Sequence, residues 1–439
     1  MKKGTKKARD NERDLAIVTG WRTPFCKAGG PLQGAAAADL ATHVLRELLD
    51  RTPLDPRQID EVILGCAGAD AREANVARVA ALRAGLPQTT TAFTVMRNCG
   101  SGMEALFEAQ RRLRAGEGEV FVVGGTESMS NFPLLMGPEL TGFFTRLGKA
   151  RSPLQKLRAL SRFRPRALKP RIAVVEGLTD PVTGLMMGHT AEKVAQRFGI
   201  DRAAMDAFAL QSHQRAAAAA AAGHFAAETV PYVPPPDHRA AVTADDGVRQ
   251  EQTLAALQKL RPVFDRQNGD VTVGNACQIT DGAVALLCMS AGKAKALGLQ
   301  PIAFVRGTAT AALAPDVMGL GPVHATPPAL QRAGLTLADL DVIELNEAFA
   351  AQVLGCVRAF ADADYCRREL GLDGALGEID PARLNPNGGA IALGHPIGAT
   401  GARLVLTLAH ELRRRGGGHG LATLCIGGGQ GQAVVLEAA

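Results

Sequence analysis

Aromatic residues are scarce in this chain: they make up 4% of the 439 residues, with one Trp and two Tyr. The core must therefore be built mainly from Ala, Val, Leu and Ile. No run of 18 apolar residues occurs, so no membrane-spanning helix is expected. The N-terminal lysines are followed by polar residues and not by an apolar run, so no secretory signal is expected.

The eight cysteines include no CxxC pair, and the Cys and His spacings do not suit a zinc site. A disulfide framework is typical of short secreted chains, whereas this length indicates two or three domains. We therefore expect reduced thiols in a cytoplasmic protein, and no metal site.

Acidic residues are absent from residues 140–175, which hold ten Lys or Arg. Residues 1–13 form a second basic segment. A nucleic-acid-binding surface would spread its basic residues over a folded domain. Because the excess here lies in a tail and one segment, no nucleic-acid partner is expected.

Short apolar runs alternate with amphipathic ones along most of the chain. This alternation predicts an α/β fold with mainly parallel sheets. The expected strands are Leu15–Val18, Glu61–Leu64, Val120–Val123, Val342–Leu345 and Ala422–Cys425, and the expected helices are Ala38–Leu49, Gly102–Arg114 and Ala402–Arg415.

The two halves of the chain resemble each other. Gln58–Leu64 and Ala338–Leu345 share a pattern, and each leads from a helix into a strand. Later in each half, Cys99–Gly125 and His395–Gly428 both run from a Gly-rich turn through a helix to a strand that ends in Gly-Gly. Such self-similarity favours two related α/β domains, although any βαβ unit shares some of this pattern.

The segment between the halves matches neither of them. We expect residues 1–131 and 234–296 to form an N-terminal domain, 132–233 an inserted loop domain and 297–439 a C-terminal domain. Within the insert, Thr190 and Asp201 can cap two helices that end at Gly199 and Gly223. Val271–Met289 is expected to return to the first domain as strand, turn and strand.

Cys99 is the first candidate for chemistry. It lies between Asn98 and Gly100, just before a predicted helix. The helix dipole and its unpaired N–H groups would lower the thiol pKa and favour the nucleophilic thiolate. The alternative, a buried structural cysteine, is common.

His395 is the second candidate. It lies in the segment NPNGGAIALGHPIGATG, Asn385–Gly401, between Gly394 and Pro396. A rigid turn would fix its imidazole, and a neutral His is the usual base for a Cys nucleophile. A structural histidine is the alternative.

Two strand ends carry the remaining candidates. Cys425 begins CIGGGQG, which does not fit a dinucleotide fingerprint because a strand follows it instead of a helix. Asn346 begins NEAFA after the strand Val342–Leu345, where polar side chains are placed for a site, although Asn346 could instead cap a helix.

These four segments together resemble the thiolase family, over nearly the whole chain. Supporting segments are VTGWRTPFCK, GGTESMS, GHTAEKV and KLRPVF, which begin at Val18, Gly124, Gly188 and Lys259. The resemblance implies two related α/β domains in a layered αβαβα arrangement with an inserted loop domain. It also implies acyl transfer to and from coenzyme A (CoA), which is a substrate, without a metal or redox cofactor.

The resemblance further assigns roles to individual residues. Cys99 would carry the acyl group, His395 would be its base, and Cys425 would move the proton at C2 of acetyl-CoA. One oxyanion hole would consist of His395 and a water held by Asn346, and the other of the N–H groups of Cys99 and Gly427. The residues expected to contact CoA are Met187, Leu260, Phe264, Cys277, Ala348 and Phe349.

Two departures from the family pattern bear on the substrate. Cys277 and Gln278 stand where the pantetheine-binding turn has Ser and Gly, and Met186–Gly188 lacks the His of short-chain biosynthetic members. We therefore expect a 3-ketoacyl-CoA thiolase of fatty acid β-oxidation, with acetyl-CoA acetyltransferase as the alternative. A decarboxylating ketosynthase or a non-catalytic relative would not need both cysteines.

The resemblance also implies partners. A homodimer or homotetramer is expected, and a hydratase–dehydrogenase subunit could join it. In Arg146–Arg171, Leu154, Leu157, Leu160 and Phe163 alternate with basic residues, which is a basic amphipathic pattern. Three interpretations remain: a surface helix packed on its own domain, a positive collar for CoA phosphates, or docking to a peripheral membrane surface or an acidic partner.

Overall fold

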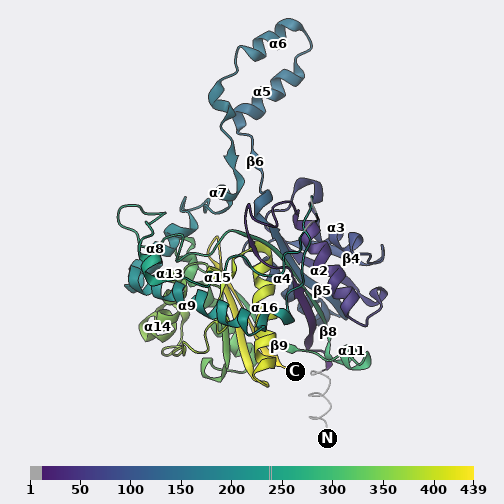
Figure 1. Ribbon diagram of the computed structural model, residues 1–439, viewed down its shortest axis with the longest axis vertical. Helices are drawn as coiled ribbons and strands as arrows, with labels where there is room; N and C mark the ends of the chain where they lie inside the picture. Colours follow the sequence, from purple (N-terminus) through teal and green to yellow (C-terminus); the bar gives the residue numbers. More distant parts are fainter. Residues whose placement is uncertain (1–11, 237, 239) are drawn as a thin grey trace.

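A computed structural model describes residues 12–236, 238 and 240–439 (Figure 1). Most of the basic N-terminal tail lies outside the described residues. In the part that is described, no helix is long and apolar enough to cross a bilayer. The same residues hold no cluster of three metal-ligating side chains.

Ten strands form one large sheet in the described part of the chain. Their order is β10-β11-β12-β9-β1-β8-β5-β3-β4, with β2 beside β8. The bounds are β1 Leu15–Arg22, β2 Cys26–Lys27, β3 Glu61–Gly65, β4 Thr91–Val95, β5 Val120–Ser128, β8 Thr280–Ser290, β9 Ala303–Ala312, β10 Val342–Leu345, β11 His419–Ile426 and β12 Gln430–Ala438.

The internal repeat appears directly in the strand pairing. In the first half, β1 pairs antiparallel with β8, β8 antiparallel with β5, and β5 parallel with β3. In the second half, β9, β12, β11 and β10 pair in the same order and the same directions. A short antiparallel contact between β1 and β9 joins the two halves.

The expectation of mainly parallel sheets is therefore wrong, because both halves are mixed. Parallel neighbours need a crossover connection, usually a helix. The turn Gly427–Gly429 joins β11 to β12 directly, so these strands are antiparallel. Strand β8 likewise follows the long inserted segment instead of a crossover helix.

Helices and sheet halves alternate in five layers. Helices α4 (Ser101–Ala115) and α16 (Ile397–Arg414) lie between the two halves and contact both. One outer layer holds α2 (Ala37–Arg51) and α3 (Val76–Arg83), and the other holds α12 (Gly321–Ala333) and α13 (Ala350–Ala361). The layered αβαβα arrangement expected from the sequence is confirmed.

Successive residues of the strands face different layers. Phe121 and Val123 pack in the central core, whereas Val120 and Val122 pack toward α2 and α3. This alternation is the period of two of a strand buried on both faces. The outer core beside α12 and α13 is a third cluster, again rich in Ala, Val and Leu.

The two central helices cross where glycines allow close contact. A Cβ on Gly102 would lie 2.8 Å from Gly398 O, and one on Gly401 would lie 2.5 Å from Met103 N. Without these glycines, the helices would have to separate. Their N-terminal turns, which follow Cys99 and His395, therefore approach each other from opposite halves.

The inserted segment contains the two expected helices, α8 (Met187–Phe198) and α9 (Arg202–Ala221). Asp201 caps α9 through a 2.8 Å bond from Ala204 N–H to its Oδ1. The expected cap at Thr190 is wrong, because α8 starts earlier and the Thr190 hydroxyl donates to Met187 O. Residues 271–279 form turns rather than a strand, since Asn275 there bonds the backbone through its side chain.

Smaller helices complete the body. They are α10 Leu254–Gln258, α11 Ala291–Ala296, α14 Ala363–Leu370 and α15 Ala390–Leu393.

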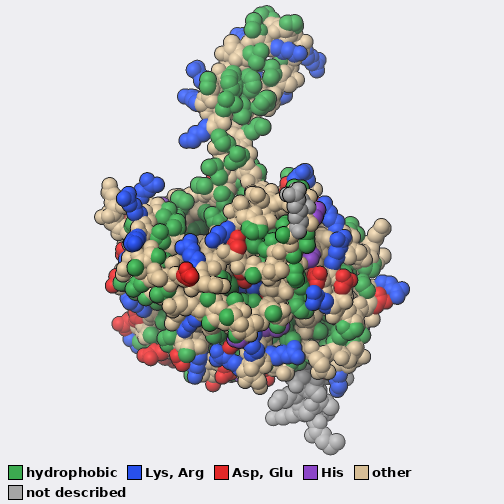
Figure 2. All heavy atoms as spheres, viewed as in Figure 1, with side chains coloured by type: hydrophobic (Ala, Val, Ile, Leu, Met, Phe, Trp, Pro, Cys, Tyr) green, Lys and Arg blue, Asp and Glu red, His purple; other side chains and the backbone are tan. Residues whose placement is uncertain are grey.

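The basic segment projects from the body as a helical hairpin (Figures 1 and 2). It consists of β6 Leu134–Leu135, α5 Pro138–Lys149, α6 Pro153–Leu160 and β7 Arg171–Ile172, followed by α7 Ala173–Gly177. Leu154, Leu157 and Leu160 are 75%, 64% and 52% exposed. The interpretation that these leucines pack on their own domain is therefore wrong.

Candidate active site

Cys99 lies in a tight turn just before α4. Asn98 adopts a φ of +43°, and the Ser101 and Gly100 N–H groups bond back to Asn98 O and Arg97 O. The Asn98 amide donates to Gly427 O across 2.9 Å. This bond ties the Cys99 turn to the CIGGG turn of the other half, so the two predicted segments do meet.

Burial raises the pKa of Cys99 to about 11, although the N–H groups of Gly427 and of Cys99 itself oppose the shift. The expected lowering of this pKa by α4 is therefore wrong. Loss of hydration outweighs the helix dipole because the thiolate would lie inside the protein. Cys99 consequently rests as a thiol and needs a base.

His395 is buried at the entrance to α16. Its N–H donates to Gln278 O across 3.1 Å, and its Nδ1 lies 2.6 Å from Thr400 Oγ1. Burial, followed by the positive charge of Arg403, lowers the pKa of His395 to about 4. The imidazole is therefore neutral at physiological pH and able to accept a proton.

Thr400 determines which ring nitrogen of His395 is free. The Thr400 hydroxyl has one proton, which it donates to Pro396 O across 2.9 Å. Its oxygen must then accept the proton on His395 Nδ1. The lone pair lies on Nε2, which is buried, has no hydrogen-bond partner in the part of the chain that the structure describes, and can receive a proton from a thiol. Sequence reasoning missed Thr400, although the motif GHPIGAT contains it.

Cys425 and Asn346 end neighbouring parallel strands, β11 and β10. The pKa of Cys425 is raised well above its ordinary value by burial, followed by the influence of Cys99, Cys356 and Cys277. Asn346 is fully buried, its N–H bonds Thr423 O across 2.9 Å, and its amide oxygen and nitrogen have no hydrogen-bond partner among the described residues. The Asn346 amide is therefore able to bond a water or a ligand.

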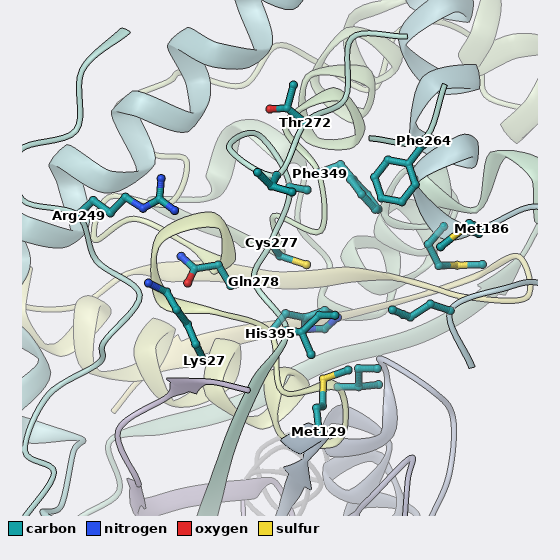
Figure 3. A pocket seen from close by; sticks show the side chains of 17 residues that line it. Lys27, Met129, Met186, Arg249, Phe264, Thr272, Cys277, Gln278, Phe349 and His395 are labelled. Atoms are coloured by element: carbon teal, nitrogen blue, oxygen red, sulfur yellow. The ribbon is translucent and has the colours of Figure 1, made fainter. Parts of the chain in front are cut away.

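A cavity of about 460 Å³ lies beside His395 (Figure 3), and Cys99, Cys425 and Asn346 are not among the residues that line it. Met187, Phe264, Cys277 and Phe349 line it, together with His395. Leu260 and Ala348 do not line the cavity but belong to the hydrophobic cluster behind it. Gly427 lies at its edge, since a Cβ there would be 3.3 Å from Met187 Sδ.

Two cations in the cavity wall were not predicted. Lys27 and Arg249 lie on the side opposite the aromatic rings of Phe264 and Phe349 (Figure 3). Neither forms an ion pair with the residues that the structure describes. Lys27 ends both the segment VTGWRTPFCK and strand β2, but nothing in that segment pointed to a ligand-binding role for it, and Arg249 lies in a loop that no motif marked.

Glu347 anchors the loop that carries His395. Its carboxylate accepts bonds from Ser212 Oγ at 2.6 Å, Asn385 Nδ2 at 2.9 Å and Ile391 N–H at 3.2 Å. Burial raises the pKa of Glu347, and these donors oppose the shift. The NEAFA motif therefore supplies a structural anchor as well as Asn346.

Comparison with known proteins identifies the family. Models described as "Thiolase, N-terminal domain" and "Thiolase, C-terminal domain" match residues 15–292 and 299–438. The chain belongs to the thiolase family. The sequence resemblance and the expected thiolase-like fold are thereby confirmed.

Similar proteins agree with this assignment. A 3-ketoacyl-CoA thiolase of Yersinia pestis (strain Pestoides F) is 43% identical over 427 residues, 96% of each chain. The structure of the Bacillus anthracis acetyl-CoA acetyltransferase is similar with a TM-score of 0.85 and 37% identity, covering 97% of this chain and 99% of that one. The structure of human mitochondrial 3-ketoacyl-CoA thiolase in complex with CoA is similar with a TM-score of 0.83 and 36% identity, covering 98% of this chain and 99% of that one.

The high pKa of Cys99 predicts how its reactivity depends on pH. Only the thiolate is alkylated, so the rate of labelling by iodoacetamide should rise about tenfold per pH unit between pH 6 and 9, without levelling off. Peptide mass spectrometry of the Cys99 peptide measures this rate. A plateau between pH 6 and 8 would show instead a preformed thiolate–imidazolium pair with His395.

Proposed function

We propose that this thiolase cleaves 3-ketoacyl-CoA with CoA, giving acetyl-CoA and an acyl-CoA shortened by two carbons, and that it also catalyses the reverse condensation. The convergence of Cys99, His395, Cys425 and Asn346 from two halves of the chain supports this function. The activity fits fatty acid β-oxidation in the cytoplasm, where the thiols stay reduced.

In the first half-reaction, Nε2 of His395 takes the Cys99 proton, and the thiolate attacks C3 of the substrate. The C2–C3 bond breaks, leaving the acyl group on Cys99 and an enolate of acetyl-CoA. His395, now protonated, and a water held by Asn346 stabilise the enolate oxygen; a well-placed donor contributes roughly 3–4 kcal/mol. Cys425, which its high pKa keeps as a thiol, protonates C2.

In the second half-reaction, CoA gives its thiol proton to the Cys425 thiolate and attacks the acyl group. The N–H groups of Cys99 and Gly427 bind the oxyanion of the tetrahedral intermediate. Collapse expels the Cys99 thiolate, which recovers its proton from His395. Cys99, His395 and Cys425 each regain their starting protonation, because the CoA thiol proton replaces the one that Cys425 gave to C2. We therefore infer that the reaction needs no cofactor and that CoA is a substrate.

The cavity suits the arm of CoA. Its apolar wall, with Met187, Phe264 and Phe349, would contact the pantetheine chain, while Leu260 and Ala348 support that wall. Arg249 would pair with the CoA phosphates as a cation without a protein partner. No residue between 134 and 172 lines this cavity, so the hairpin is not supported as a phosphate collar.

One assay tests the proposed function. The purified chain should cleave acetoacetyl-CoA and a long-chain 3-ketoacyl-CoA only when CoA is present, releasing acetyl-CoA in each case. Comparable kcat/KM values for the two substrates support a 3-ketoacyl-CoA thiolase. Cleavage of acetoacetyl-CoA alone would support the acetyl-CoA acetyltransferase alternative, and no cleavage of either would refute the proposal.

We also propose a homodimer or homotetramer. Strand β4 ends the sheet and pairs only with β3 among the described strands, so its outer edge offers free backbone groups. Met96, directly after β4, is 69% exposed. A hydratase–dehydrogenase subunit remains a proposed further partner. The boundaries at residues 132, 234 and 297 likewise stay a proposal.

We propose that the hairpin docks on an anionic membrane surface, with its leucines inserted and its arginines near the phosphates. Changing Arg158, Arg162, Arg164 and Arg166 to Gln should reduce cosedimentation with phosphatidylglycerol vesicles at least tenfold, because each basic residue contributes roughly 1 kcal/mol near such a surface. Turnover of acetoacetyl-CoA should stay within about twofold, since the hairpin is remote from the cavity.

A matched variant controls for net charge. Four arginines on the body, Arg57, Arg72, Arg114 and Arg367, are exposed and can be changed to Gln together. This variant should bind vesicles like the wild type. Equal loss in both variants would contradict docking by the hairpin. Unchanged vesicle binding with lost copurification of a partner subunit would indicate a protein partner, and a large rise in KM for CoA would indicate the phosphate collar.

A further inference from the structure

Gln278 occupies a position where the pantetheine-binding turn of the family is expected to have Gly. Its side chain is in the cavity wall, between Lys27 and Cys277 (Figure 3). Nε2 donates to Ile391 O and to Gly247 O, each across 3.1 Å. The backbone oxygen of Gln278 accepts the N–H of His395.

The orientation of this amide follows from its partners. Nε2 faces two carbonyl oxygens, which can only accept hydrogen bonds. The opposite orientation would place Oε1 against both of them. In this chain the Gln278 side chain therefore donates twice, to both carbonyl oxygens.

These bonds join three segments of the site. Ile391 belongs to α15, four residues before His395, and Gly247 lies two residues before Arg249. The segments are in close contact, because a Cβ on Gly247 would lie 2.4 Å from Ala392 O. With Gly at position 278, only the backbone bond to His395 would remain.

We propose that Gln278 is a positioning residue that fixes the His395 loop against the loop of Arg249. It compensates in this chain for the flexibility that Gly-rich neighbours give the His395 loop. A displacement of about 1 Å in a catalytic group can cost roughly a hundredfold in rate. This role rests on the proposed function of His395.

Two variants test the proposal. Gln278→Met keeps the length of the side chain but cannot donate, so kcat for acetoacetyl-CoA thiolysis should fall about 10- to 100-fold. Alkylation of Cys99 by iodoacetamide, which does not depend on turnover, should keep its wild-type rate, because it reports the thiol and not the position of His395.

Gln278→Glu should give a pH dependence of activity that is not expected if residue 278 acts only by packing. A carboxylate between two carbonyl oxygens is repelled and its pKa is raised, whereas the protonated acid can donate one bond. The activity of the Glu variant, divided by that of the Met variant, should therefore rise about tenfold as the pH falls from 8.5 to 6. Dividing by the activity of the Met variant removes the pH dependence that comes from the rest of the enzyme.

The outcomes separate this inference from the proposed function. Inactive wild-type protein would refute the function itself. Active wild type with wild-type kcat in Gln278→Met, or a Glu-to-Met ratio that does not change with pH, would refute the role of Gln278. If Gln278→Met fails to fold by circular dichroism, Gln278→Gly, the residue expected in the family, replaces it, and the same loss of kcat is expected. If Gln278→Glu fails to fold, the kcat of Gln278→Met decides.

Discussion

Changing Cys99 to Ala should abolish thiolysis and condensation, lowering kcat by at least about 10⁴-fold. Neither neighbouring thiol should replace Cys99: burial raises the pKa of Cys277 to about 12 and that of Cys425 well above its ordinary value, so each forms a thiolate less readily than Cys99. Cleavage of acetoacetyl-CoA, followed by loss of the enolate absorbance, measures the effect.

The matching control is Cys356→Ala. Cys356 is fully buried beneath α12, and its thiol donates to Gly319 O, so it has no route to the substrate. This variant should keep its activity. In the wild type, iodoacetamide should label Cys99 fastest of the eight cysteines, and acyl-CoA should protect it. Faster labelling of Cys356 or Cys366 would contradict the assignment of the nucleophile.

Changing Cys425 to Ala should separate acyl transfer from cleavage of the carbon–carbon bond. Acyl transfer from acyl-CoA to Cys99 expels CoA as a thiolate, which can leave without a proton from Cys425, so this transfer should persist. Cleavage of the carbon–carbon bond needs an acid at C2, so it should fall at least about 10³-fold. Intact mass spectrometry detects the trapped acyl-enzyme, and the acetoacetyl-CoA assay measures the loss.

Cys366→Ala is the control for this second variant, because Cys366 is also buried and its thiol donates to the backbone at Ala359 O. It should resemble the wild type in both assays. Cleavage by Cys425→Ala at close to the wild-type rate would show that another group supplies the proton. Loss of acyl-enzyme as well would indicate that Cys425 supports the Cys99 turn instead.

The motifs marked most of the candidate groups because each motif combines a reactive side chain with the glycines that shape its turn. The bond from Asn98 to Gly427 joins the Cys99 turn to the CIGGG turn. The roles of Thr400, Glu347 and Gln278 were missed. Their roles depend on the direction of one hydrogen bond or on partners more than 100 residues away.

The direction of the Cys99 pKa shift also escaped prediction. A helix N-terminus is visible in the sequence, but the depth of burial is not. In the folded chain, α4 is covered by α16 and by the turn at Gly427, so loss of hydration exceeds the dipole effect. The burial of Cys99, which only the packed structure reveals, is therefore the reason why a base such as His395 is needed.

For the fold, the sequence by itself determined the elements, their order and the internal repeat, because periodicity, caps and glycine stops are local. Gly199 and Gly223 follow α8 and α9 with positive φ, at the points where the sequence predicts these helices to end. Only the tertiary structure decided the strand directions and the setting of the basic hairpin. Strand direction depends on whether the connection between two strands crosses the sheet. In the sequence, leucines that pack in a core have the same helical spacing as leucines that lie exposed, such as Leu154 and Leu157.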